Sequence, residues 1–382
     1  MAITEEKSLQ DQLPPSQAAA MRAVQRAAAE LRRGGFVLVE DDGHAVLAQA
    51  AETATADSLA ALTRSCQGPV HLILTAARAR GLNLAVAGEH PVALTLDDGV
   101  EVDLVRGLID PIAPLQPYPP AGVARLDEGE AKPAAAAVEL AKLAQLLPAA
   151  LIADLPAGPI DRFVAKNDVL RVGASAITNY PELAVVTLRP IGEARVPLAV
   201  AEDARVVGFR PADGGIEQFA ILIGDPAAHQ PALCRLHSEC FTGDLLGSLR
   251  CDCGPQLRDA LRLMGEAGHG VLLYMAHEGR GIGLINKLRA YELQDRGFDT
   301  VEANRHLGFE PDERTYAAAA VMLRHLGIAQ VRLLTNNPAK VRALTAQGIE
   351  VVDRVPHAVP ANRHNRAYLA TKAQKSGHLL QS

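Results

Sequence analysis

In the second half of the chain, short apolar runs alternate with helical patterns that end at a glycine, and this alternation constrains the fold more than any other feature. Residues 271–275 form an apolar run of strand type. Helical patterns follow over residues 284–295 and 315–326, and Gly297 and Gly327 end them. This order predicts an α/β to α+β architecture with a mixed sheet. We predict further strands over residues 218–223, 232–237, 331–334 and 349–352, and further helices over residues 255–267 and 340–347.

The first part of the chain shows the same alternation. Residues 17–33 predict a helix that Gly34 ends, and Asp57 is expected to cap a helix that runs to residue 65. We therefore expect two domains, over residues 1–170 and 195–382, each a mixed sheet with helices packed on it. We also predict strands over residues 36–40, 70–75 and 149–155, a long loop from Pro114 to Pro133, a helix over residues 134–147 and a linker over residues 171–194.

Composition excludes several classes of protein. The 382 residues are 48% hydrophobic and 21% charged, which is typical of a globular chain. No apolar run approaches the roughly 18 residues of a membrane span, and the polar N-terminus has no signal pattern, so we expect a cytoplasmic protein with no membrane partner. The net charge of −6, the 3% aromatic content and the lack of Trp argue against nucleic acid as a partner.

Four of the five cysteines lie between residues 234 and 253, and three have the pattern Cys240-x10-Cys251-x-Cys253. In a reducing compartment, such a cluster is more often metal-binding or catalytic than cross-linked. Three thiolates suit Zn²⁺ and leave a fourth position for a water, which is the pattern of a catalytic zinc. The alternatives are a structural zinc completed by His237, and plain buried cysteines.

Two glycine- and asparagine-containing turns are candidates for anion binding. The first is Glu278-Gly-Arg-Gly-Ile-Gly, which lies between a predicted strand and a predicted helix. Arg280, Lys287 and Arg289 would reinforce it, although an ordinary glycine turn also explains it. The second is Thr335-Asn-Asn-Pro with Lys340, for which the alternative is a turn that only caps its helix.

Asp312 and Arg314 form a further candidate pair before the helix expected at residue 315. Asp312 is either the N-cap of that helix or a carboxylate base beside a guanidinium directed at phosphate. Together with the cysteines and the two turns, this pair indicates metal-assisted hydrolysis of a nucleotide.

The second half of the chain resembles the GTP cyclohydrolase II family. The resemblance rests on RLHSECFTGDLLGSLRCDCG, EGRGIGLINKLRAYELQDRGFDTVEAN, LGFEPDERTY, LLTNNPAK and YLATKAQKSGHLL, which occur in family order from about residue 195 to residue 380. It implies zinc on Cys240, Cys251 and Cys253. It also implies Asp312 as proton acceptor, Arg314 as nucleophile toward the α-phosphate and Tyr291 at the active site. The implied GTP contacts are Arg235, Leu236, His237, Ser238, Glu239, Gln256, Glu278, Gly279, Arg280, Thr300, Thr335 and Lys340.

The activity implied by this resemblance is hydrolysis of GTP to 2,5-diamino-6-hydroxy-4-(5-phosphoribosylamino)pyrimidine, formate and pyrophosphate in riboflavin biosynthesis. It implies one Zn²⁺ per chain, Mg²⁺ with the GTP triphosphate and a homodimer. The chain departs from the family at Ala276-His277, where Arg-Gln is usual. A paralogue acting on another nucleotide or pyrimidine is therefore an alternative, and a non-catalytic nucleotide-sensing module is another. A sensor needs no acid–base group or nucleophile, so Asp312 and Arg314 favour the enzyme.

The N-terminal half resembles the frame of 3,4-dihydroxy-2-butanone 4-phosphate synthase in GGFVLVEDDG and ELAKLAQLLPAALIADL. The acidic, Mg²⁺-binding run of that family is replaced after Asp42 by His44-Ala-Val-Leu-Ala-Gln, and the later histidine motif has no counterpart. The resemblance implies a domain that keeps the frame without the catalyst.

Overall fold

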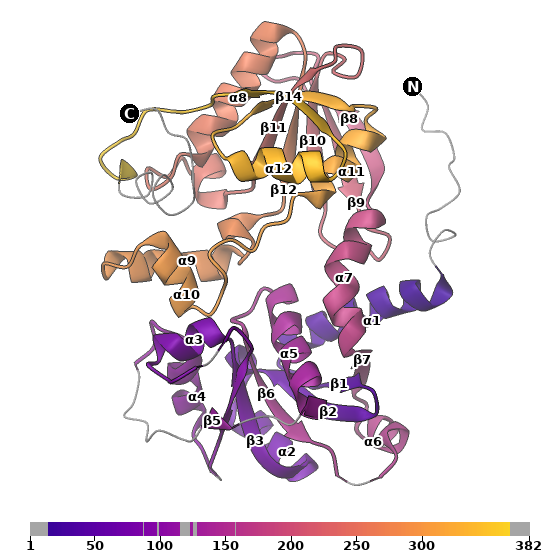
Figure 1. Ribbon diagram of the computed structural model, residues 1–382, viewed down its shortest axis with the longest axis vertical. Helices are drawn as coiled ribbons and strands as arrows, with labels where there is room; N and C mark the ends of the chain where they lie inside the picture. Colours follow the sequence, from indigo (N-terminus) through magenta and orange to yellow (C-terminus); the bar gives the residue numbers. More distant parts are fainter. Residues whose placement is uncertain are drawn as a thin grey trace. The chain divides into compact units, whose positions relative to one another are not determined.

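A computed structural model describes residues 14–366 apart from 87, 98, 115–122, 125–127 and 157. Most of the predicted loop after Pro114 and the final family-like stretch lie outside the described residues. The chain forms two compact units, shown in Figure 1. The first unit comprises Met1–Pro181 and Ile285–Asp312, and the second comprises Glu182–Leu284 and Glu313–Ser382.

The first unit is built around a seven-stranded mixed sheet with strand order β5-β4-β3-β6-β2-β1-β7. Its neighbouring strands are antiparallel except β1 and β7, which are parallel. The strands are β1 Val37–Asp41, β2 His44–Ala50, β3 Gln67–Leu74, β4 Val92–Thr95, β5 Val123–Ala124, β6 Ala149–Asp154 and β7 Leu170–Gly173. The helices are α1 Pro15–Arg32, α2 Ala56–Ser65, α3 Ala76–Gly81, α4 Val102–Ile109, α5 Glu128–Leu143, α6 Ile160–Asn167, α7 Ala174–Val186, which continues into the second unit, α9 Leu284–Asp295 and α10 Thr300–His306.

Two helix starts in the first unit differ from the sequence prediction. Thr55 caps α2, because its side chain accepts from the Ser58 N–H while the Ser58 hydroxyl accepts from the Thr55 N–H. Asp57 therefore lies in the first turn and is not the cap. Helix α5 begins at Glu128, within the predicted loop, and contains Pro133. Proline removes only one hydrogen bond there, and the buried Ala134, Ala137 and Leu140 hold the helix.

The second unit contains another seven-stranded mixed sheet, with strand order β14-β13-β11-β12-β10-β9-β8, which confirms the predicted fold class. The β12-β11-β13-β14 side is parallel and the β8-β9-β10-β12 side is antiparallel. The strands are β8 Arg189–Arg195, β9 Arg205–Arg210, β10 Gln218–Ile223, β11 Ala232–Ser238, β12 Gly270–Met275, β13 Gln330–Leu334 and β14 Glu350–Val355. The helices are α8 Cys253–Ala267, α11 Ala317–His325 and α12 Pro338–Ala346, with a π-helical turn at Phe241–Leu245 and a 3-10 turn at Glu278–Arg280.

Parallel strands β11 and β12 place the chemistry-bearing loops at one edge of the second sheet. The apolar side chains of β11 and β12 are buried in the core of this unit. Phe209 of β9 is among the largest fully buried side chains in the same core. Both strands run in the same direction, so the segments that follow Ser238 and Met275 emerge at the same edge. The Cys240 loop and the Glu278 turn are those segments.

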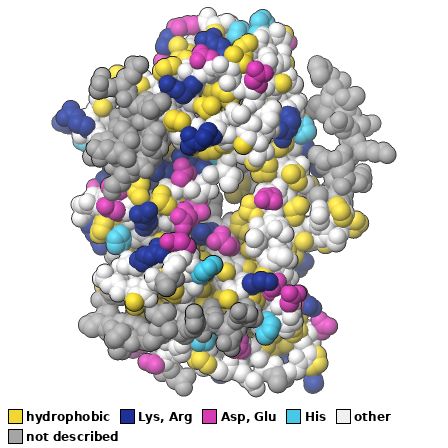
Figure 2. Space-filling view, in the orientation of Figure 1, with side chains coloured by type: hydrophobic (Ala, Val, Ile, Leu, Met, Phe, Trp, Pro, Cys, Tyr) yellow, Lys and Arg dark blue, Asp and Glu magenta, His cyan; other side chains and the backbone are white. Residues whose placement is uncertain are grey.

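The surface carries both signs of charge. Figure 2 shows Lys and Arg side chains interspersed with Asp and Glu on the face that it draws. Among the described residues, no helix has the length and apolar character needed to span a bilayer.

His357 predicts a loss of stability in acid. Its side chain is 1% exposed, its Nε2 lies 3.1 Å from Asp259 Oδ2, and burial lowers its pKa from 6.5 to about 4. Below about pH 6.5 the unfolded chain binds a proton that the folded chain does not bind until about pH 4. The free energy of unfolding should therefore decrease as the pH is lowered from about 6.5 to about 4, by at most about 1.4 kcal/mol per pH unit. Urea unfolding between pH 4.5 and 7.5 measures the slope, and a His357→Gln variant with an equal slope would contradict the assignment.

Candidate metal centre and active site

The three predicted thiols converge on the π-helical turn that follows β11. The sulfur atoms of Cys240, Cys251 and Cys253 all lie within 4.8 Å of one another, and those of Cys240 and Cys251 are 3.7 Å apart. Gly243 lies against them, because a Cβ at this position would be 2.7 Å from the Cys251 sulfur and 3.0 Å from the Cys240 sulfur. Only glycine leaves room for the cluster, and its N–H donates to the Cys240 sulfur.

Crowding and burial oppose ionisation of these thiols. The neighbouring Cys240 thiol and burial raise the pKa of Cys251 to about 11. The Cys240 and Cys251 thiols and burial raise the pKa of Cys253 well above its usual value. Crowded thiols resist ionisation, and a divalent cation would supply the compensating charge. A cluster of three sulfur donors suits a soft ion such as Zn²⁺.

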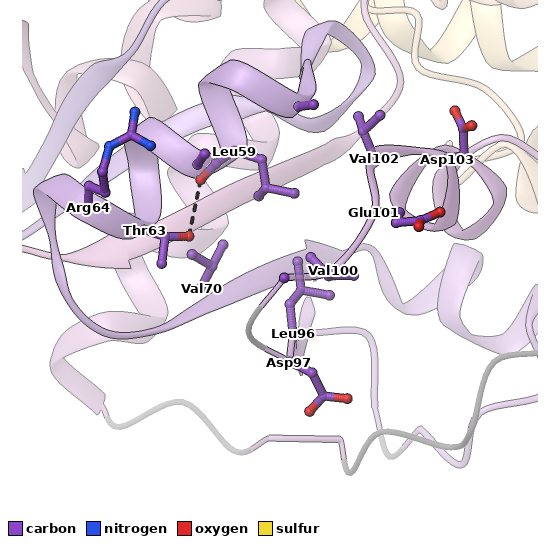
Figure 3. Close-up of a pocket in the computed structure, with 13 residues that line it drawn as sticks. Leu59, Thr63, Arg64, Val70, Leu96, Asp97, Val100, Glu101, Val102 and Asp103 are labelled. Atoms are coloured by element: carbon purple, nitrogen blue, oxygen red, sulfur yellow. Dashed lines mark hydrogen bonds between the residues drawn. The ribbon is translucent and has the colours of Figure 1, made fainter.

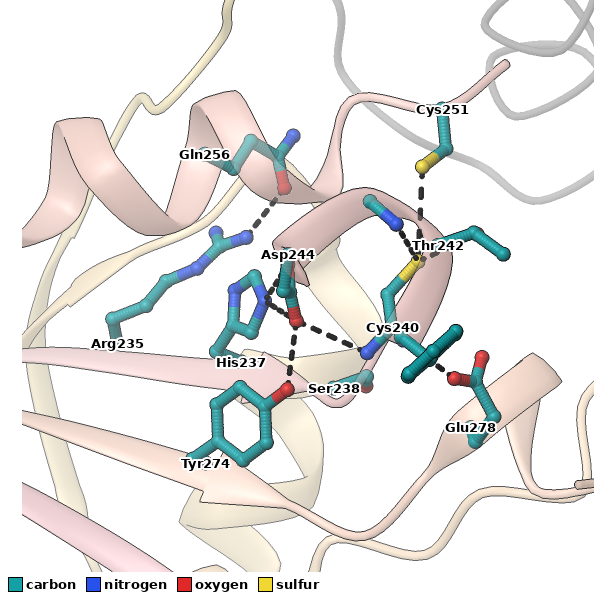
Figure 4. Close-up of polar contacts among 12 residues, drawn as sticks. Arg235, His237, Ser238, Cys240, Thr242, Asp244, Cys251, Gln256, Tyr274 and Glu278 are labelled. Atoms are coloured by element: carbon teal, nitrogen blue, oxygen red, sulfur yellow. Dashed lines mark hydrogen bonds and ion pairs between the residues drawn. The ribbon is translucent and has the colours of Figure 1, made fainter. Parts of the chain in front are cut away.

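His237 does not join the three sulfurs, so the structure gives no support to the alternative in which it completes a structural zinc site. Its Nε2 lies 3.1 Å from both carboxylate oxygens of Asp244. Asp244 Oδ2 also accepts from the Cys240 N–H and the Tyr274 hydroxyl (Figure 4). Sequence reasoning missed Asp244. The only hint in the sequence is that Asp244 follows the candidate ligand Cys240 by four residues, within the loop that begins at Cys240.

Glu278 fixes the relative position of the two loops. Its carboxylate accepts from the Phe241 N–H at 2.6 Å and from the Gly279 N–H at 2.9 Å. Gly279 and Arg280 have φ values of 62° and 65°, so the Glu278 turn is a left-handed bend rather than the first turn of a helix. This geometry agrees with the alternative of a glycine turn, and helix α9 begins directly after the segment, at Leu284.

Several of the predicted GTP contacts are buried and bonded within the second unit. Arg235 is 5% exposed and donates to the Leu334 carbonyl at 3.0 Å and to Gln256 Oε1 at 2.5 Å. Lys340 donates to the Leu236 carbonyl at 2.7 Å. The remaining buried members of the predicted set are Leu236, His237, Glu278 and Thr335, and the partly exposed ones are Ser238, Glu239, Gln256, Gly279 and Arg280.

The asparagine turn caps its helix, as the plainer reading of that motif predicted. Asn337 is the N-cap of α12, and its side chain accepts from the Ala339 N–H. The Thr335 hydroxyl accepts from the Asn337 N–H and is thereby part of the same turn.

Arg314 lies beside the strand that leads into the thiol loop. One of its guanidinium nitrogens lies 3.2 Å from the Ser238 hydroxyl, and Ser238 precedes Cys240 by two residues. The guanidinium carbon is also 5.7 Å from the centre of the Tyr316 ring. The structure therefore brings Arg314 to the strand end from which Cys240 is presented.

Tyr291, Thr300 and Asp312 belong to the first unit. Thr300 begins α10 after its cap Asp299, and the Lys287 ammonium lies 5.7 Å from the centre of the Tyr291 ring. Asp312 is exposed and does not cap α11, because that helix begins only at Ala317.

Two further sequence features have structural partners. Arg289 does not serve the Glu278 turn, because it forms ion pairs with Glu52 and Asp110 of the first unit. The His277 ring stands edge-on to Tyr316, with ring centres 5.7 Å apart.

The first unit contains a cavity of about 600 Å³ between α2 and residues 96–103 (Figure 3). Apolar side chains such as Leu59 and Val70 form much of its lining, and none of the predicted site residues lies in it.

The family model for GTP cyclohydrolase II matches residues 189–356, a range that contains the three thiols and Arg314. A GTP cyclohydrolase-2 of Azospirillum brasilense is 50% identical over 369 residues, which cover 96% of this chain and 96% of that protein. The chain belongs to the GTP cyclohydrolase II family. A GTP cyclohydrolase-2 of Escherichia coli is 53% identical over 193 residues, which are 50% of this chain and 98% of that protein.

Among solved structures, a two-domain 3,4-dihydroxy-2-butanone 4-phosphate synthase from A. baumannii is similar to this GTP cyclohydrolase II family member. It has a TM-score of 0.34 and 15% sequence identity, and the match covers 82% of this chain and 93% of that chain. A TM-score of this size does not establish a shared fold.

Proposed function

We propose that this enzyme is a zinc-dependent GTP cyclohydrolase II that converts GTP to the diaminopyrimidine ribosyl phosphate, formate and pyrophosphate in riboflavin biosynthesis. The observation that carries the proposal is the group of three sulfurs within 4.8 Å. It lies in a chain 50% identical over its length to a protein named GTP cyclohydrolase-2. Cytoplasmic location, a homodimer and the sequence division at residues 170 and 195 remain part of this proposal.

Cys240, Cys251 and Cys253 would hold the zinc, with Gly243 leaving room for the sulfurs and Asp244 holding the Cys240 backbone. When bound there, zinc supplies the Lewis acidity that activates water for opening of the imidazole ring at C8. Asp244 itself is fixed by Tyr274 and His237, so the ligand loop is tied to β11 and β12.

Arg314 supplies positive charge for the phosphate step in this proposal. A guanidinium is protonated at neutral pH, so electrostatic stabilisation at the α-phosphate is the role that its chemistry supports directly. The family resemblance assigns it a nucleophilic role, with Asp312 as proton acceptor and Tyr291 nearby. Mg²⁺ would accompany the triphosphate, and Thr300, Thr335 and Lys340 are among the proposed nucleotide contacts.

The test is to incubate the purified, zinc-loaded protein with GTP and Mg²⁺ and to measure formate and pyrophosphate together. Both products are expected, in equal amounts. Reactions with ATP and with pyrimidine nucleotides serve as controls for the paralogue alternative. Tight GTP binding without formate would instead support the sensing module.

The N-terminal region should not make dihydroxybutanone phosphate. That reaction needs carboxylates and a divalent cation for enediolate chemistry. Asp41 pairs with Lys132 at 3.1 Å, and Asp42 and Gly43 form the left-handed turn between β1 and β2. Val46 and Leu47 are buried in β2, where the acidic run would lie. With ribulose 5-phosphate and Mg²⁺, we expect no formate above background. Turnover comparable to an authentic synthase would make the protein bifunctional.

A further inference from the structure

Helices α9 and α10 lie within the family-matched range, residues 189–356, yet they pack with the N-terminal part of the chain. Residues Ile285–Asp312 and Met1–Pro181 form the same compact unit. Figure 1 draws α10 beside α3, and a Cβ on Gly81 at the end of α3 would lie 3.2 Å from His306 Nδ1. The N-terminal region therefore has a specific internal partner.

The Arg289 guanidinium makes three charge-assisted contacts. Its Nη2 lies 2.8 Å from Glu52 Oε1, its Nε lies 3.2 Å from Asp110 Oδ2, and its Nη1 lies 2.7 Å from Asn286 Oδ1. The side chains of Arg289, Glu52 and Asp110 are only 16%, 19% and 17% exposed. Solvent therefore screens these pairs much less than a surface pair. Glu52 is itself fixed, because its second oxygen accepts from the Leu147 N–H at 2.6 Å.

The far end of the same segment is held by Arg78, which is 4% exposed. Arg78 donates to the Leu108 carbonyl at 2.7 Å and to the Gly107 carbonyl at 3.2 Å. A third N–H donates to the His306 carbonyl, the last residue of α10, at 3.0 Å. Because the Arg78 guanidinium is buried, it needs hydrogen-bond acceptors within the protein, and these three carbonyls supply them.

Gly308 shows how closely the segment approaches the N-terminal region. Its carbonyl accepts from the Thr75 hydroxyl at 2.8 Å. A Cβ on Gly308 would lie 2.9 Å from Pro148 Cγ and 3.0 Å from Thr75 Oγ1, and its φ is +91°. Residues 285–308 are thus fixed near both ends, by Arg289 at one and by Arg78 and Thr75 at the other.

We propose that the N-terminal region is a positioning platform for α9 and α10, with Glu52 and Asp110 holding Arg289 as its central contact. Tyr291 lies two residues after Arg289, and Thr300 begins α10. Both carry roles at the nucleotide in the proposed function, on which this inference rests. Glu52 and Asp110 are therefore positioning residues for GTP binding, supplied by a region outside the matched family range.

The test compares the full-length Glu52→Gln/Asp110→Asn double variant with a matched Glu89→Gln control. Both changes in the double variant keep shape and remove charge, and Asp110→Asn keeps the oxygen that accepts from the Ile112 N–H. Glu89 pairs with Arg80 in the same unit, but its side chain is 77% exposed. We expect the double variant to raise the KM for GTP about tenfold with a smaller change in kcat, because the reacting groups remain while the bound geometry loosens. Zinc content should not change.

Hydrogen exchange provides a readout that does not depend on activity. Backbone amides of residues 285–308 should exchange at least about tenfold faster in the double variant and at the wild-type rate in the control. If the double variant does not fold, the single Asp110→Asn variant is measured in the same way. An unchanged KM overturns the proposal, even where exchange rises, and so does unchanged exchange. If wild-type protein does not turn over GTP, the proposed function fails, and the dissociation constant of GTP replaces KM in this comparison.

Discussion

Replacing Cys251 by Ser should remove both the metal and formate release. The variant loses one of three sulfur donors that lie within 4.8 Å of one another, and a hydroxyl is a poor substitute for a thiolate at zinc. Metal activation of water is worth several kcal/mol, so formate release should fall by at least about a thousandfold. Metal analysis of the purified protein and a formate assay measure the two effects.

Cys66→Ser is the matched control for this experiment. Cys66 follows α2 in the first unit and is not part of the thiol cluster. The zinc content and formate release of the Cys66→Ser protein should equal those of the wild type. A Cys251→Ser protein that retains a full complement of zinc and full activity would show that the cluster is not the catalytic metal site.

Replacing Arg314 by Ala should impair the phosphate step. The Cys251→Ser variant should retain part of that step. Arg314 is the cation beside Ser238 at the end of β11, and a cation at a reacting phosphate typically contributes a factor of 100 or more. We therefore expect pyrophosphate and formate to fall together by at least about a hundredfold in Arg314→Ala. Cys251→Ser should release some pyrophosphate without formate.

Arg262→Ala is the matched control, because Arg262 lies on α8 in exposed ion pairs with Asp259 and Glu266. It should leave both products at wild-type levels. Wild-type pyrophosphate release by Arg314→Ala would remove Arg314 from the phosphate step, whatever its effect on formate.

The parts of the molecule that sequence patterns predicted are those that local chemistry determines. Helix α9 has the predicted bounds, because glycines precede and follow its periodic pattern. The convergence of Cys240, Cys251 and Cys253 followed from metal-ligand spacing. By contrast, the stretch expected as a linker forms most of β8 and helix α7, which buries Ile177 and Tyr180 despite weak periodicity.

Long-range contacts account for what the patterns missed. Asp244 received no role because its partners His237 and Tyr274 come from two different strands. The compact units are discontinuous in sequence, because residues 285–312 pack with the N-terminal part of the chain. Nothing local to Arg289 indicates that its partners are Glu52 and Asp110, which lie 237 and 179 residues earlier.

The discontinuous units also set the order in which the chain completes its folding during synthesis. A growing chain folds from its N-terminus as residues leave the ribosome. The first unit needs Ile285–Asp312, so Glu52 and Asp110 meet Arg289 only after those residues have been made. The same holds for Arg78 and the His306 carbonyl. The second unit begins to emerge during that wait, yet it needs Glu313–Ser382 to complete its sheet with β13 and β14. The two units therefore finish folding in close succession, after Ile285–Asp312 and then Glu313–Ser382 have been made.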